Sequence, residues 1–503
     1  MTARCVMVLG TSSGAGKSWL ATALCRHYAN QGLKVAPFKA QNMSNNARVV
    51  AGADGVAGEI GSAQYFQALA ARAVPDVRMN PLLLKPEADT HSQVVLLGQV
   101  DRELTALPWR GRSERVWLRI AAALDALRAE NDVVVIEGAG SPAEINLMAS
   151  DVVNLRVARH ADAACLLAAD IDRGGAFAHL YGTWALLPEA DRARIHGFVL
   201  NRFRGDASLL APAPEQLQAL TGVPTVAVVP MRFGHGLPEE DGVFDDRAVP
   251  SPQGSTSGGR STRIAIVAYP RISNLDEFQP LKNVPGVSLA WARSPATLAD
   301  VDWVVLPGSK ATAADLAWLR AQRLDTAVAA HAARGGRVLG ICGGLQMLGE
   351  ALIDVHGVES EGNAPGLGLL PLVTCFEPGK TVRHAAQRFG ALTGAWSALS
   401  NVPVAGYEIH SGRTVQHPAM AAKGDVAREV MAGLAWQNVA GNVLGVYLHG
   451  LFEDAAVLRA LFGADAPALD AVFDGLADAV ERAFAPGVLD ALVQRRIQAN
   501  ARV

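Results

Sequence analysis

The sequence predicts an α/β fold with two separate domains, each built around a parallel sheet. Three observations support this prediction. Short, continuous apolar runs recur along the chain, a Ser-, Gly- and Pro-rich segment divides them into two series, and glycine or polar residues follow the runs where strands would end. The chain has 503 residues, half of them apolar, which is enough for substantial cores in roughly two to four domains.

The first series consists of six apolar runs, each bounded by Gly, Pro, Asn or Asp, with helical stretches between many of them. Continuous runs, unlike alternating ones, are typical of strands that are buried on both faces. We therefore expect a parallel sheet with helices on each side. The six runs are Cys5–Leu9, Leu33–Phe38, Asp132–Ile136, Ala163–Ala169, Gly197–Leu200 and Thr225–Val229.

The boundary between the domains is predicted at residues 251–262, SPQGSTSGGRST, because this segment has the composition of a flexible linker and no apolar periodicity. Apolar runs then resume, and the end of the chain is Ala- and Leu-rich with helical spacing. The predicted parts are a first domain (1–250), the linker, a second domain (263–458) and a C-terminal helical segment (459–503). The runs of the second domain are Arg263–Ala268, Trp303–Leu306, Arg337–Ile341 and Val443–Leu448.

Composition excludes several functional classes. The formal net charge is −3 and no long basic run occurs, so we expect no nucleic-acid partner. The five cysteines are scattered without metal-ligand spacing, which is typical of a reduced, cytoplasmic protein. No uncharged apolar run reaches the roughly 18 residues that a membrane span needs, and the N-terminal residues lack a basic leader. The sequence does not indicate an oligomeric state.

A glycine-rich loop, Gly10–Ser18 (GTSSGAGKS), follows the first predicted strand and precedes a helix. This order aims backbone N–H groups and a helix N-terminus at phosphates. Lys17 would reach the β- and γ-phosphates of ATP, and the Ser18 hydroxyl would ligate Mg²⁺. Thr11 stands where the usual motif has its first glycine, so the loop is a lengthened variant, and an ordinary Gly-rich turn is the alternative. The residues expected to contact the nucleotide here are Gly14, Gly16, Lys17 and Ser18.

Polar residues at the ends of other predicted strands complete this site. Glu137 ends one buried run and Lys39 follows another. The carboxyl ends of parallel strands face the nucleotide crevice, so we expect Glu137 to share the Mg²⁺ with Ser18 and Lys39 to contact ATP. Asn201 follows a third strand and is expected near the nucleotide base. Each of these residues is also compatible with an ordinary loop position.

The second domain contains a candidate nucleophile, Cys342, in the sequence GICGGLQ. It lies between a predicted strand and a helix, where a sharp turn exposes the sulfur at a helix N-terminus and favours the thiolate. The neighbouring glycines leave room for a substrate, and Gly343 is expected to contribute a backbone N–H to an oxyanion hole. A buried structural cysteine is the alternative.

His449 is the candidate base for this thiol. It follows the predicted strand Val443–Leu448, which places it at the same sheet edge as Cys342. A strand-end histidine is by itself more often structural, so this assignment depends on the pairing with Cys342. Gly308, in the sequence PGS after another strand, is expected to donate a second oxyanion N–H.

Taken together, the two halves resemble known families. The first resembles the dethiobiotin synthetase-like ATPases, which share the lengthened loop and the EGAG sequence at Glu137, and this implies a P-loop NTPase-type sheet. The second resembles the triad-type, or class I, glutamine amidotransferases. Their fusion in this order resembles the cobyric acid synthase family of cobalamin biosynthesis. The further matching segments are QNMSN (41–45), MNPLLLKP (79–86), RISN (271–274), LPGSK (306–310), GYEIH (406–410) and YLHG (447–450).

The resemblance implies a glutamine-hydrolysing amidoligase that uses ATP, Mg²⁺ and glutamine. Members of the family amidate the b, d, e and g carboxylates of adenosylcobyrinic acid a,c-diamide, at one glutamine and one ATP for each amide. The family's nucleophile falls on Cys342 and its histidine on His449. Triad-type amidotransferases carry a Glu two residues after the histidine, but here that residue is Leu451, so the group that orients His449 is unassigned and Glu453 is a candidate.

The implied corrinoid substrate is a polyanion, so its binding would need a local basic patch on this mildly acidic chain. Three other functions compete with this reading: a cobyrinic acid a,c-diamide synthase, a P-loop switch or metallochaperone ATPase, and a glutamine-sensing regulator. The switch leaves the cysteine turn unexplained, and an intact Cys342 with His449 argues against the regulator. The candidate patch residues are Arg48, Arg78, Lys85 and Arg173.

Overall fold

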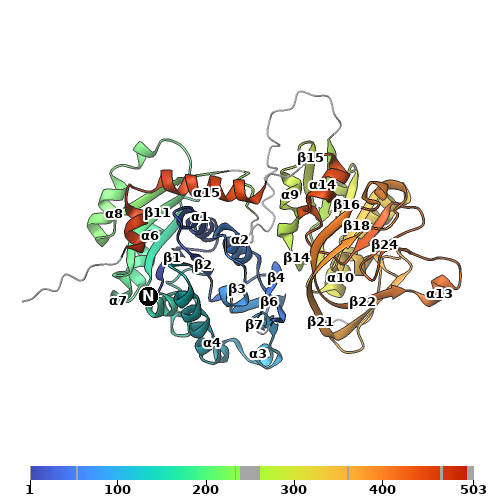
Figure 1. The fold of residues 1–503 in the computed structure, drawn as a ribbon, viewed down its shortest axis with the longest axis horizontal. Helices are drawn as coiled ribbons and strands as arrows, with labels where there is room; N and C mark the ends of the chain where they lie inside the picture. The colour runs from blue at the N-terminus through green and yellow to red at the C-terminus, as the bar shows by residue number, and fades with distance from the viewer. Residues whose placement is uncertain are drawn as a thin grey trace, which may run out of the picture.

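The computed structural model describes residues 2–52, 55–232, 234–237, 261–359, 362–464 and 468–494. Figure 1 shows two bodies side by side, each a β-sheet flanked by helices, with the N-terminal body in blue to green and the C-terminal body in yellow to orange. The predicted α/β class with two sheet domains is confirmed. Residues 251–260 of the predicted linker lie outside the described residues.

A six-stranded parallel sheet forms the centre of the N-terminal body, in the order β12-β11-β10-β1-β9-β2. Both of its faces are covered by helices. Val6 and Val8 therefore face one core while Met7 and Leu9 face the other, and this explains why the sequence shows a continuous apolar run. The strands are β1 (Arg4–Gly10), β2 (Val35–Phe38), β9 (Val133–Glu137), β10 (Ala164–Asp170), β11 (Ile195–Phe203) and β12 (Thr225–Pro230).

Helices of the N-terminal body pack on this sheet, and α1 and α4 cover opposite faces. The helices are α1 (Lys17–Asn30), α2 (Ser62–Ala70), α3 (Arg102–Ala106), α4 (Trp109–Glu130), α5 (Leu155–Ala161), α6 (Ala176–Leu186), α7 (Glu189–Arg192) and α8 (Ala213–Thr221). Two small sheets, β3-β6-β7-β8 and β4-β5, lie on the side toward the other body (Figure 1). Their strands are β3 (Gln41–Met43), β4 (Ala47–Ala51), β5 (Ala57–Gly61), β6 (Leu82–Ala88), β7 (His91–Leu96) and β8 (Gln99–Val100).

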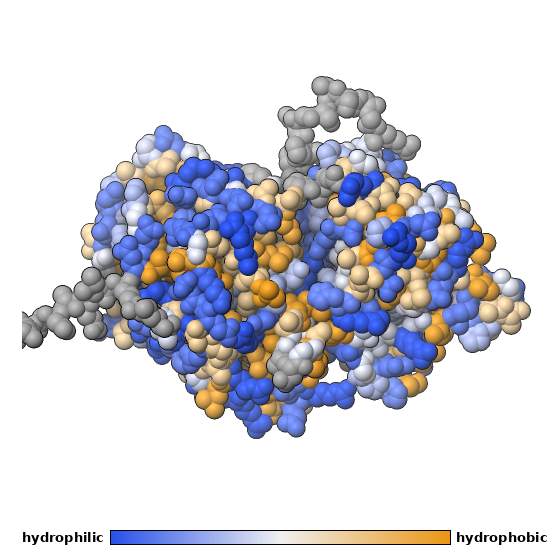
Figure 2. All heavy atoms as spheres, in the orientation of Figure 1, coloured by the Kyte–Doolittle hydropathy of each residue, from blue (hydrophilic) through white to orange (hydrophobic). Residues whose placement is uncertain are grey.

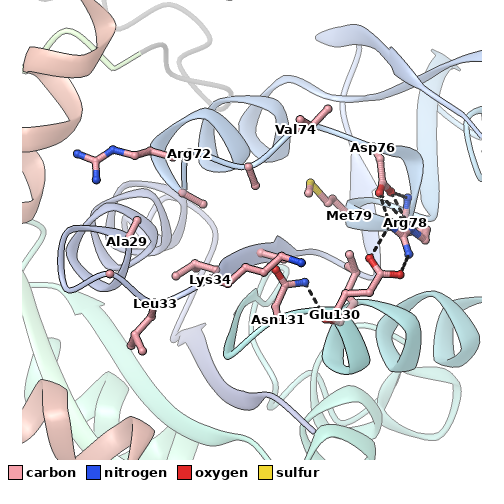
Figure 3. A pocket seen from close by; sticks show the side chains of 16 residues that line it. Ala29, Leu33, Lys34, Arg72, Val74, Asp76, Arg78, Met79, Glu130 and Asn131 are labelled. Carbon is pink, nitrogen blue, oxygen red and sulfur yellow. Dashed lines mark hydrogen bonds and ion pairs between the residues drawn. The ribbon is translucent and has the colours of Figure 1, made fainter. Parts of the chain in front are cut away.

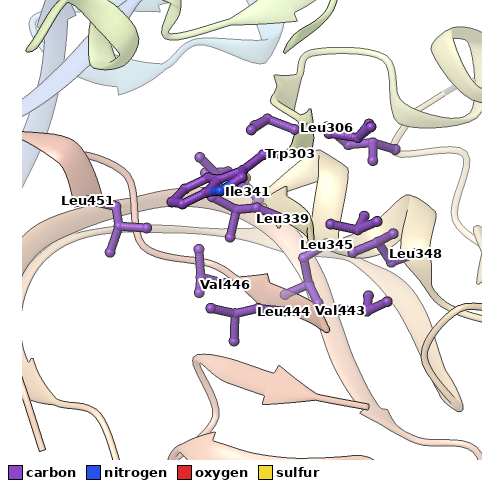
Figure 4. Close-up of a cluster of buried hydrophobic side chains, with 14 of the residues drawn as sticks. Trp303, Leu306, Leu339, Ile341, Leu345, Leu348, Val443, Leu444, Val446 and Leu451 are labelled. Carbon is purple, nitrogen blue, oxygen red and sulfur yellow. The ribbon is translucent and has the colours of Figure 1, made fainter. Parts of the chain in front are cut away.

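A seven-stranded sheet, in the order β15-β13-β16-β18-β25-β24-β23, forms the centre of the C-terminal body. Its first five strands are parallel, β24 pairs antiparallel with β25, and β23 pairs antiparallel with β24. Figure 4 shows Trp303, Ile341 and Val446 in the apolar core on this sheet. The strands are β13 (Thr262–Val267), β15 (Val287–Ala292), β16 (Trp303–Leu306), β18 (Arg337–Ile341), β23 (Arg428–Met431), β24 (Ala435–Gln437) and β25 (Val443–Val446).

A long antiparallel hairpin, β21 with β22, belongs to a separate four-stranded sheet and extends toward the N-terminal body. Ile409 of β22 packs against Ala47, Leu83 and Val95 of the N-terminal body, so one small apolar cluster joins the two. The remaining strands are β14 (Ile272–Ser273), β17 (Gly308–Ser309), β19 (Ala351–Ile353), β20 (Ala364–Pro365), β21 (Leu372–Arg388) and β22 (Pro403–Gln416). The helices are α9 (Gln279–Lys282), α10 (Thr312–Ala321), α11 (Leu324–Ala333), α12 (Gly343–Leu348), α13 (Pro418–Ala421) and α14 (Ala455–Phe462).

The last two helices of the described residues, α15 (Leu469–Ala483) and α16 (Val488–Val493), return to the N-terminal body, where α15 crosses α1 (Figure 1). Arg26 of α1 is buried beneath α15 and forms ion pairs of 2.7 Å with both Asp470 and Asp474. On the face shown in Figure 2, hydrophilic and hydrophobic side chains are intermixed. Within the described ranges, no helix combines the length and the apolar character that crossing a membrane requires.

Candidate active sites

The glycine-rich loop lies between the end of β1 and the start of α1. Gly16 has a φ of 86°, and a Cβ at this position would come within 2.0 Å of the Asn201 amide nitrogen, so the backbone here requires glycine. The Lys17 ammonium folds back over the loop, where it donates to the carbonyl oxygens of Ser12 at 2.9 Å and Gly140 at 3.2 Å. The loop and the N-terminus of α1 together form a cradle suited to phosphates.

Glu137 ends β9 and lies beside this loop because β9 is a direct neighbour of β1. Its buried carboxylate accepts hydrogen bonds from Ser18 Oγ at 2.9 Å and Lys39 Nζ at 2.8 Å. Burial alone would raise the pKa of Glu137, but the Lys39 ammonium and the hydrogen bonds lower it below its ordinary value. Glu137 is therefore held as a carboxylate at the edge of the phosphate cradle.

Two glutamines that were not among the predicted site residues also hold Glu137. Gln67 Nε2 donates to its second oxygen at 2.6 Å, and Gln64 Nε2 lies 3.5 Å from the same atom. Both glutamines come from α2, three residues apart and therefore on one helix face. That spacing was the available signal in the sequence, but nothing in it pointed to a carboxylate so distant in the chain.

Ser18 and Glu137 provide the kind of hard oxygen ligands that Mg²⁺ prefers. Among the residues that the structure describes, no cluster of three or more His, Cys, Asp or Glu side chains could hold a metal by itself. Mg²⁺ in ATP-dependent enzymes is usually bound by one or two protein oxygens together with substrate phosphates and water. The hydroxyl and carboxylate at this position therefore fit a nucleotide-bound Mg²⁺.

Asn201 lies in β11 at the same edge of the sheet. Its Nδ2 donates to the carbonyl oxygen of Ala15 at 2.9 Å, and its Oδ1 accepts from the N–H of Arg202 at 2.9 Å. The Asn201 side chain thus holds the backbone of the phosphate loop in place. Its expected contact with a nucleotide base stays a prediction.

The four basic candidates for corrinoid binding lie in separate places. Arg78 lines an open cleft of about 500 Å³ at the amino end of β2, where it is bonded to Asp76 and Glu130 (Figure 3). The phosphate loop lies at the opposite, carboxyl end of the sheet strands, so Arg78 is far from the nucleotide cradle in this topology. Arg78 therefore does not share a site with the phosphate loop.

The other three candidates lie closer to the functional regions. Arg48 and Lys85 are buried in ion pairs on the side of the N-terminal body that faces its neighbour, so their charges are already neutralised and neither belongs to an exposed patch for a polyanion. Arg173 has a side chain that is 71% exposed, and its Nη2 lies 3.7 Å from the position that a Cβ on Gly14 would take. Arg173 thus combines exposure with a position beside the phosphate loop.

Cys342 stands on the sharp turn between β18 and α12. Its φ of 50° and ψ of −107° are unusual for a residue with a side chain and cost roughly 1–3 kcal/mol, which is typical of a strained functional position. The neighbouring glycines permit this turn, since a Cβ on Gly344 would come within 1.9 Å of the Leu306 carbonyl oxygen. The Cys342 thiol lies 3.7 Å from the carbonyl oxygen of Ile409, to which it donates.

His449 lies where the chain leaves β25, and its imidazole interacts with the Cys342 sulfur. The predicted run ended at Leu448, but the strand ends at Val446, because His449 exchanges backbone hydrogen bonds of 2.9 and 3.2 Å with Tyr407 of β22 instead. Burial by itself would lower the pKa of His449, yet the Glu277 carboxylate and the Cys342 sulfur raise it to about 10. The imidazole is therefore poised to hold a proton taken from the thiol.

Glu277 is the acid that orients His449, and no local sequence signal identified it. Its Oε1 accepts from His449 Nδ1 at 3.2 Å, and its Oε2 accepts from the N–H of Gly450 at 3.2 Å. Glu277 lies 172 residues before the histidine, in a short 3₁₀ turn, η5 (Leu275–Phe278), so no spacing rule connects the two. The earlier candidate, Glu453, forms an ion pair with Arg48 instead.

The two glycines expected in the oxyanion hole lie beside the Cys342 turn. A Cβ on Gly343 would come within 2.7 Å of the backbone nitrogen of Ser309. Gly308 precedes Ser309, and a Cβ on Gly308 would lie 2.9 Å from Cε1 of His449. Both glycines thus border the space next to the sulfur and the imidazole. Donation by their amides to an oxyanion stays a prediction.

Comparisons with known proteins match both halves of the chain. Residues 6–239 match the CobQ/CobB/MinD/ParA nucleotide binding domain, and residues 263–457 match the CobB/CobQ-like glutamine amidotransferase domain. A cobyric acid synthase from Acidovorax sp. strain JS42 is 78% identical, covering 97% of this chain and 98% of its own length. Cobyric acid synthases from Acidovorax ebreus and Variovorax paradoxus are 77% and 76% identical, each covering 98% of this chain and 99% and 100% of their own lengths.

These matches combine the two regions in one order: a nucleotide-binding half that holds the phosphate cradle, followed by an amidotransferase half that holds Cys342, His449 and Glu277. These relatives match 97–98% of the chain at 76–78% identity, which establishes that they share its fold. The chain belongs to the cobyric acid synthase family.

Proposed function

We propose that this enzyme amidates the b, d, e and g carboxylates of adenosylcobyrinic acid a,c-diamide to give adenosylcobyric acid, using ATP and glutamine. The observation that carries the proposal is the Cys342–His449–Glu277 arrangement in the same chain as a phosphate cradle. Glutamine hydrolysis is assigned to residues 263–458, and ATP-dependent synthesis to residues 1–250, with 251–262 as the linker and 459–503 as the C-terminal segment. The relatives named cobyric acid synthase support the choice of substrate.

Glutamine hydrolysis begins when the Cys342 sulfur attacks the side-chain amide of glutamine. His449 takes the thiol proton and returns it to the departing ammonia, while Glu277 keeps Nδ1 protonated and so leaves Nε2 free for the thiol. The backbone amides of Gly308 and Gly343 stabilise the oxyanion of the tetrahedral intermediate. Water then hydrolyses the thioester, and glutamate leaves.

Synthesis begins when a corrinoid carboxylate attacks the γ-phosphate of ATP. The carboxylate needs this activation because it is anionic and its oxygen is a poor leaving group. Lys17 and the loop amides of Gly14 and Gly16 hold the phosphates and stabilise the charge of the transition state, and Lys39 lies within reach of the same edge. Mg²⁺ bound near Ser18 and Glu137 would neutralise phosphate charge. Ammonia then displaces phosphate from the acyl phosphate to give the amide.

Ammonia must cross from one site to the other, because free ammonia is mostly protonated in neutral water. Ile409 lies at this crossing. Its carbonyl oxygen accepts from the Cys342 thiol, and its side chain packs against Ala47 and Leu83 of the synthetase half. We place the route of ammonia along this contact between the bodies.

Two alternatives make different predictions. A cobyrinic acid a,c-diamide synthase would use the same chemistry on other carboxylates and would add two amides to its own substrate. A P-loop switch or metallochaperone ATPase would hydrolyse ATP without consuming glutamine. The relatives favour neither alternative.

The experiment that tests the proposal is mass spectrometry of adenosylcobyrinic acid a,c-diamide after incubation with the enzyme, ATP, Mg²⁺ and glutamine. Four successive amidations, each matched by one glutamate released, are expected. A substrate mass that does not change while ATP is hydrolysed would refute the proposal, and amidation that needs an earlier, non-amidated corrinoid would favour the sister synthase.

A further inference from the structure

Arg48 is a buried arginine of the N-terminal body whose charge is neutralised by the C-terminal body. It lies in β4, and its side chain is 2% exposed. Its guanidinium is hydrogen-bonded to Asp276 and forms an ion pair with Glu453, with Nη2 at 2.6 Å from Oε1. Burying a charge so completely is costly unless it is paired, so this contact fixes how the two bodies meet.

The two carboxylates that Arg48 holds flank the hydrolytic site. Asp276 directly precedes Glu277 in η5, and Glu453 ends the turn η8 (Leu451–Glu453), which starts two residues after His449. Glu277 in turn bonds both His449 and Gly450. The segment that carries the acid and the segment that carries the base are thus bound to one guanidinium from the other body.

The two residues that precede Arg48 in the chain, Asn46 and Ala47, add hydrogen bonds to this contact. The N–H of Ala47 donates to Asn274 Oδ1 at 2.9 Å, and Asn46 Oδ1 accepts from the N–H of Leu275 at 2.9 Å. The Arg48 guanidinium also lies over the ring of Tyr407, 5.1 Å from its centroid. That ring stacks on the imidazole of His449, with centroids 5.4 Å apart. Arg48 therefore reaches the catalytic base by an aromatic contact as well as through the carboxylates.

We propose that Arg48 is a positioning residue of the glutamine-hydrolysing site, supplied by the ATP-binding half of the chain. It sets the place of η5 and η8 and thereby the contact of Glu277 with His449. Hydrolysis then reaches its full rate only when the half that consumes ammonia is docked, which prevents futile loss of glutamine. The inference rests on the proposed glutaminase role of Cys342 and deepens it.

The charges around Glu277 make the proposed role of Arg48 visible in the pH dependence of glutamine hydrolysis. His449 and Asp276 face Glu277 directly, and Arg48 and Glu453 lie beyond Asp276. Tyr269 and Tyr407 also interact with the Glu277 charge, and Cys342 interacts with His449. Burial raises the pKa of Glu277, the His449 contact opposes that rise, and the charge of Asp276 adds to it. Removing Arg48 would leave Asp276 and Glu453 unneutralised, so Glu277 would take up a proton at a higher pH.

The test compares Arg48→Gln with a matched control in the full-length enzyme. Arg26 is also buried and is also held by two aspartates, but it lies under α15, remote from the hydrolytic site. Two rates are measured: glutamate release from glutamine alone, and amidation of the corrinoid with ammonium in place of glutamine. We expect Arg48→Gln to lower kcat for glutamate release by about 10- to 100-fold, within what a general base contributes, with the KM for glutamine changed by less than about threefold.

In Arg48→Gln the acid limb of the kcat profile should move to higher pH, while ammonium-dependent amidation stays within about threefold of the wild type. Arg26→Gln should lower thermal stability and leave kcat and the pH profile of glutamate release unchanged. Arg48→Lys keeps the charge and disturbs folding less, so it serves if Arg48→Gln does not fold. It should lower glutamate release by about three- to tenfold with no movement of the acid limb.

A double-mutant cycle shows whether Arg48 acts through Glu277. If it does, Arg48→Gln combined with Glu277→Gln should be no slower in glutamate release than Glu277→Gln alone. Losses that multiply, a wild-type rate in both Arg48 variants, or a parallel fall of both activities would overturn the inference. Because glutamate release is measured without corrinoid, a failure of the wild type to amidate the corrinoid would refute the proposed substrate and leave this inference standing.

Discussion

Replacing Glu277 by Gln tests the arrangement around His449 directly, because it changes the chemistry of one side chain with little change in volume. The Glu277 carboxylate accepts from two donors, His449 Nδ1 and the backbone N–H of Gly450, each at 3.2 Å. A glutamine offers one acceptor and one donor in the same place. Whichever way its amide turns, one of the two N–H groups faces another donor.

The structure allows the size of the effect to be worked out. If the amide oxygen stays with Gly450, the NH₂ group donates to Nδ1 of His449, so the ring proton moves to Nε2. Nε2 can then no longer accept the proton of Cys342, and general-base catalysis is lost. That contribution is about 10²–10⁴-fold, or about 3–5 kcal/mol of transition-state stabilisation. The missing negative charge acts in the same direction, because Glu277 contributes to raising the pKa of His449 to about 10.

The assay is glutamate release from glutamine, with ammonium-dependent amidation measured in parallel. We expect Glu277→Gln to lower kcat for glutamate release by about 10²–10⁴-fold and to leave the ammonium reaction within about threefold of the wild type. Glu429→Gln, at an exposed position of the same domain, serves as the control and should leave both rates unchanged. A glutamate-release rate for Glu277→Gln within threefold of the wild type would refute the role of Glu277.

Three further predictions concern the other groups. Cys342→Ala should abolish glutamine-dependent amidation and spare the ammonium reaction, whereas Lys17→Ala should remove both; loss of the ammonium reaction in a folded Cys342→Ala enzyme would contradict the two-site scheme. Gly16→Ala should abolish ATP-dependent amidation and leave glutamate release intact, because the new methyl group would collide with the Asn201 amide 2.0 Å away; retained amidation would show that the loop tolerates a side chain. Glu59 is buried, which alone would raise its pKa, but the ammonium groups of Lys380 and Lys85 lower it to about 2. Its carboxylate therefore contributes stability above its ordinary pKa, about 3 kcal/mol, which is lost as the pH falls from about 4.5 toward 2. Glu59→Gln should flatten the fall of the unfolding temperature in that window, and a slope equal to that of the wild type would argue against a charged Glu59.

The centres of both sheets were predictable from the sequence because their strands are buried on both faces. The runs at Cys5–Leu9 and Arg337–Ile341 became β1 and β18 with shifts of at most a residue at each end. The edge strand β15 was missed, since four of its six residues are only partly buried and its sequence shows no continuous buried run. The hairpin of β21 and β22 was missed for the same reason, because the outer part of β21 is largely exposed. Partial burial removes the periodicity on which such predictions depend.

The site residues likewise fall into those that the sequence predicted and those that only the structure revealed. The roles of Lys17, Ser18 and Cys342 could be predicted from the residues next to them. A phosphate-binding loop and a nucleophile turn each need particular neighbours within a few residues. Asn201 was also found at the phosphate loop, but as a brace for the backbone of Ala15. Gln67 escaped notice because its partner, Glu137, is 70 residues away and the pairing exists only once α2 has packed against the sheet.

The position of the orienting acid follows from what each member of the hydrolytic site requires. The nucleophile must sit on a strained turn at a helix N-terminus, and the base must leave a neighbouring strand at the same edge, so both are fixed by the sheet. The acid has only to reach Nδ1 of His449, and any segment that passes behind the imidazole can supply it. Here the segment is η5, which is itself hydrogen-bonded to Arg48 and Asn46 of the N-terminal body. Placing the acid at the boundary between the bodies makes hydrolysis depend on their contact, which an acid two residues after the histidine would not do.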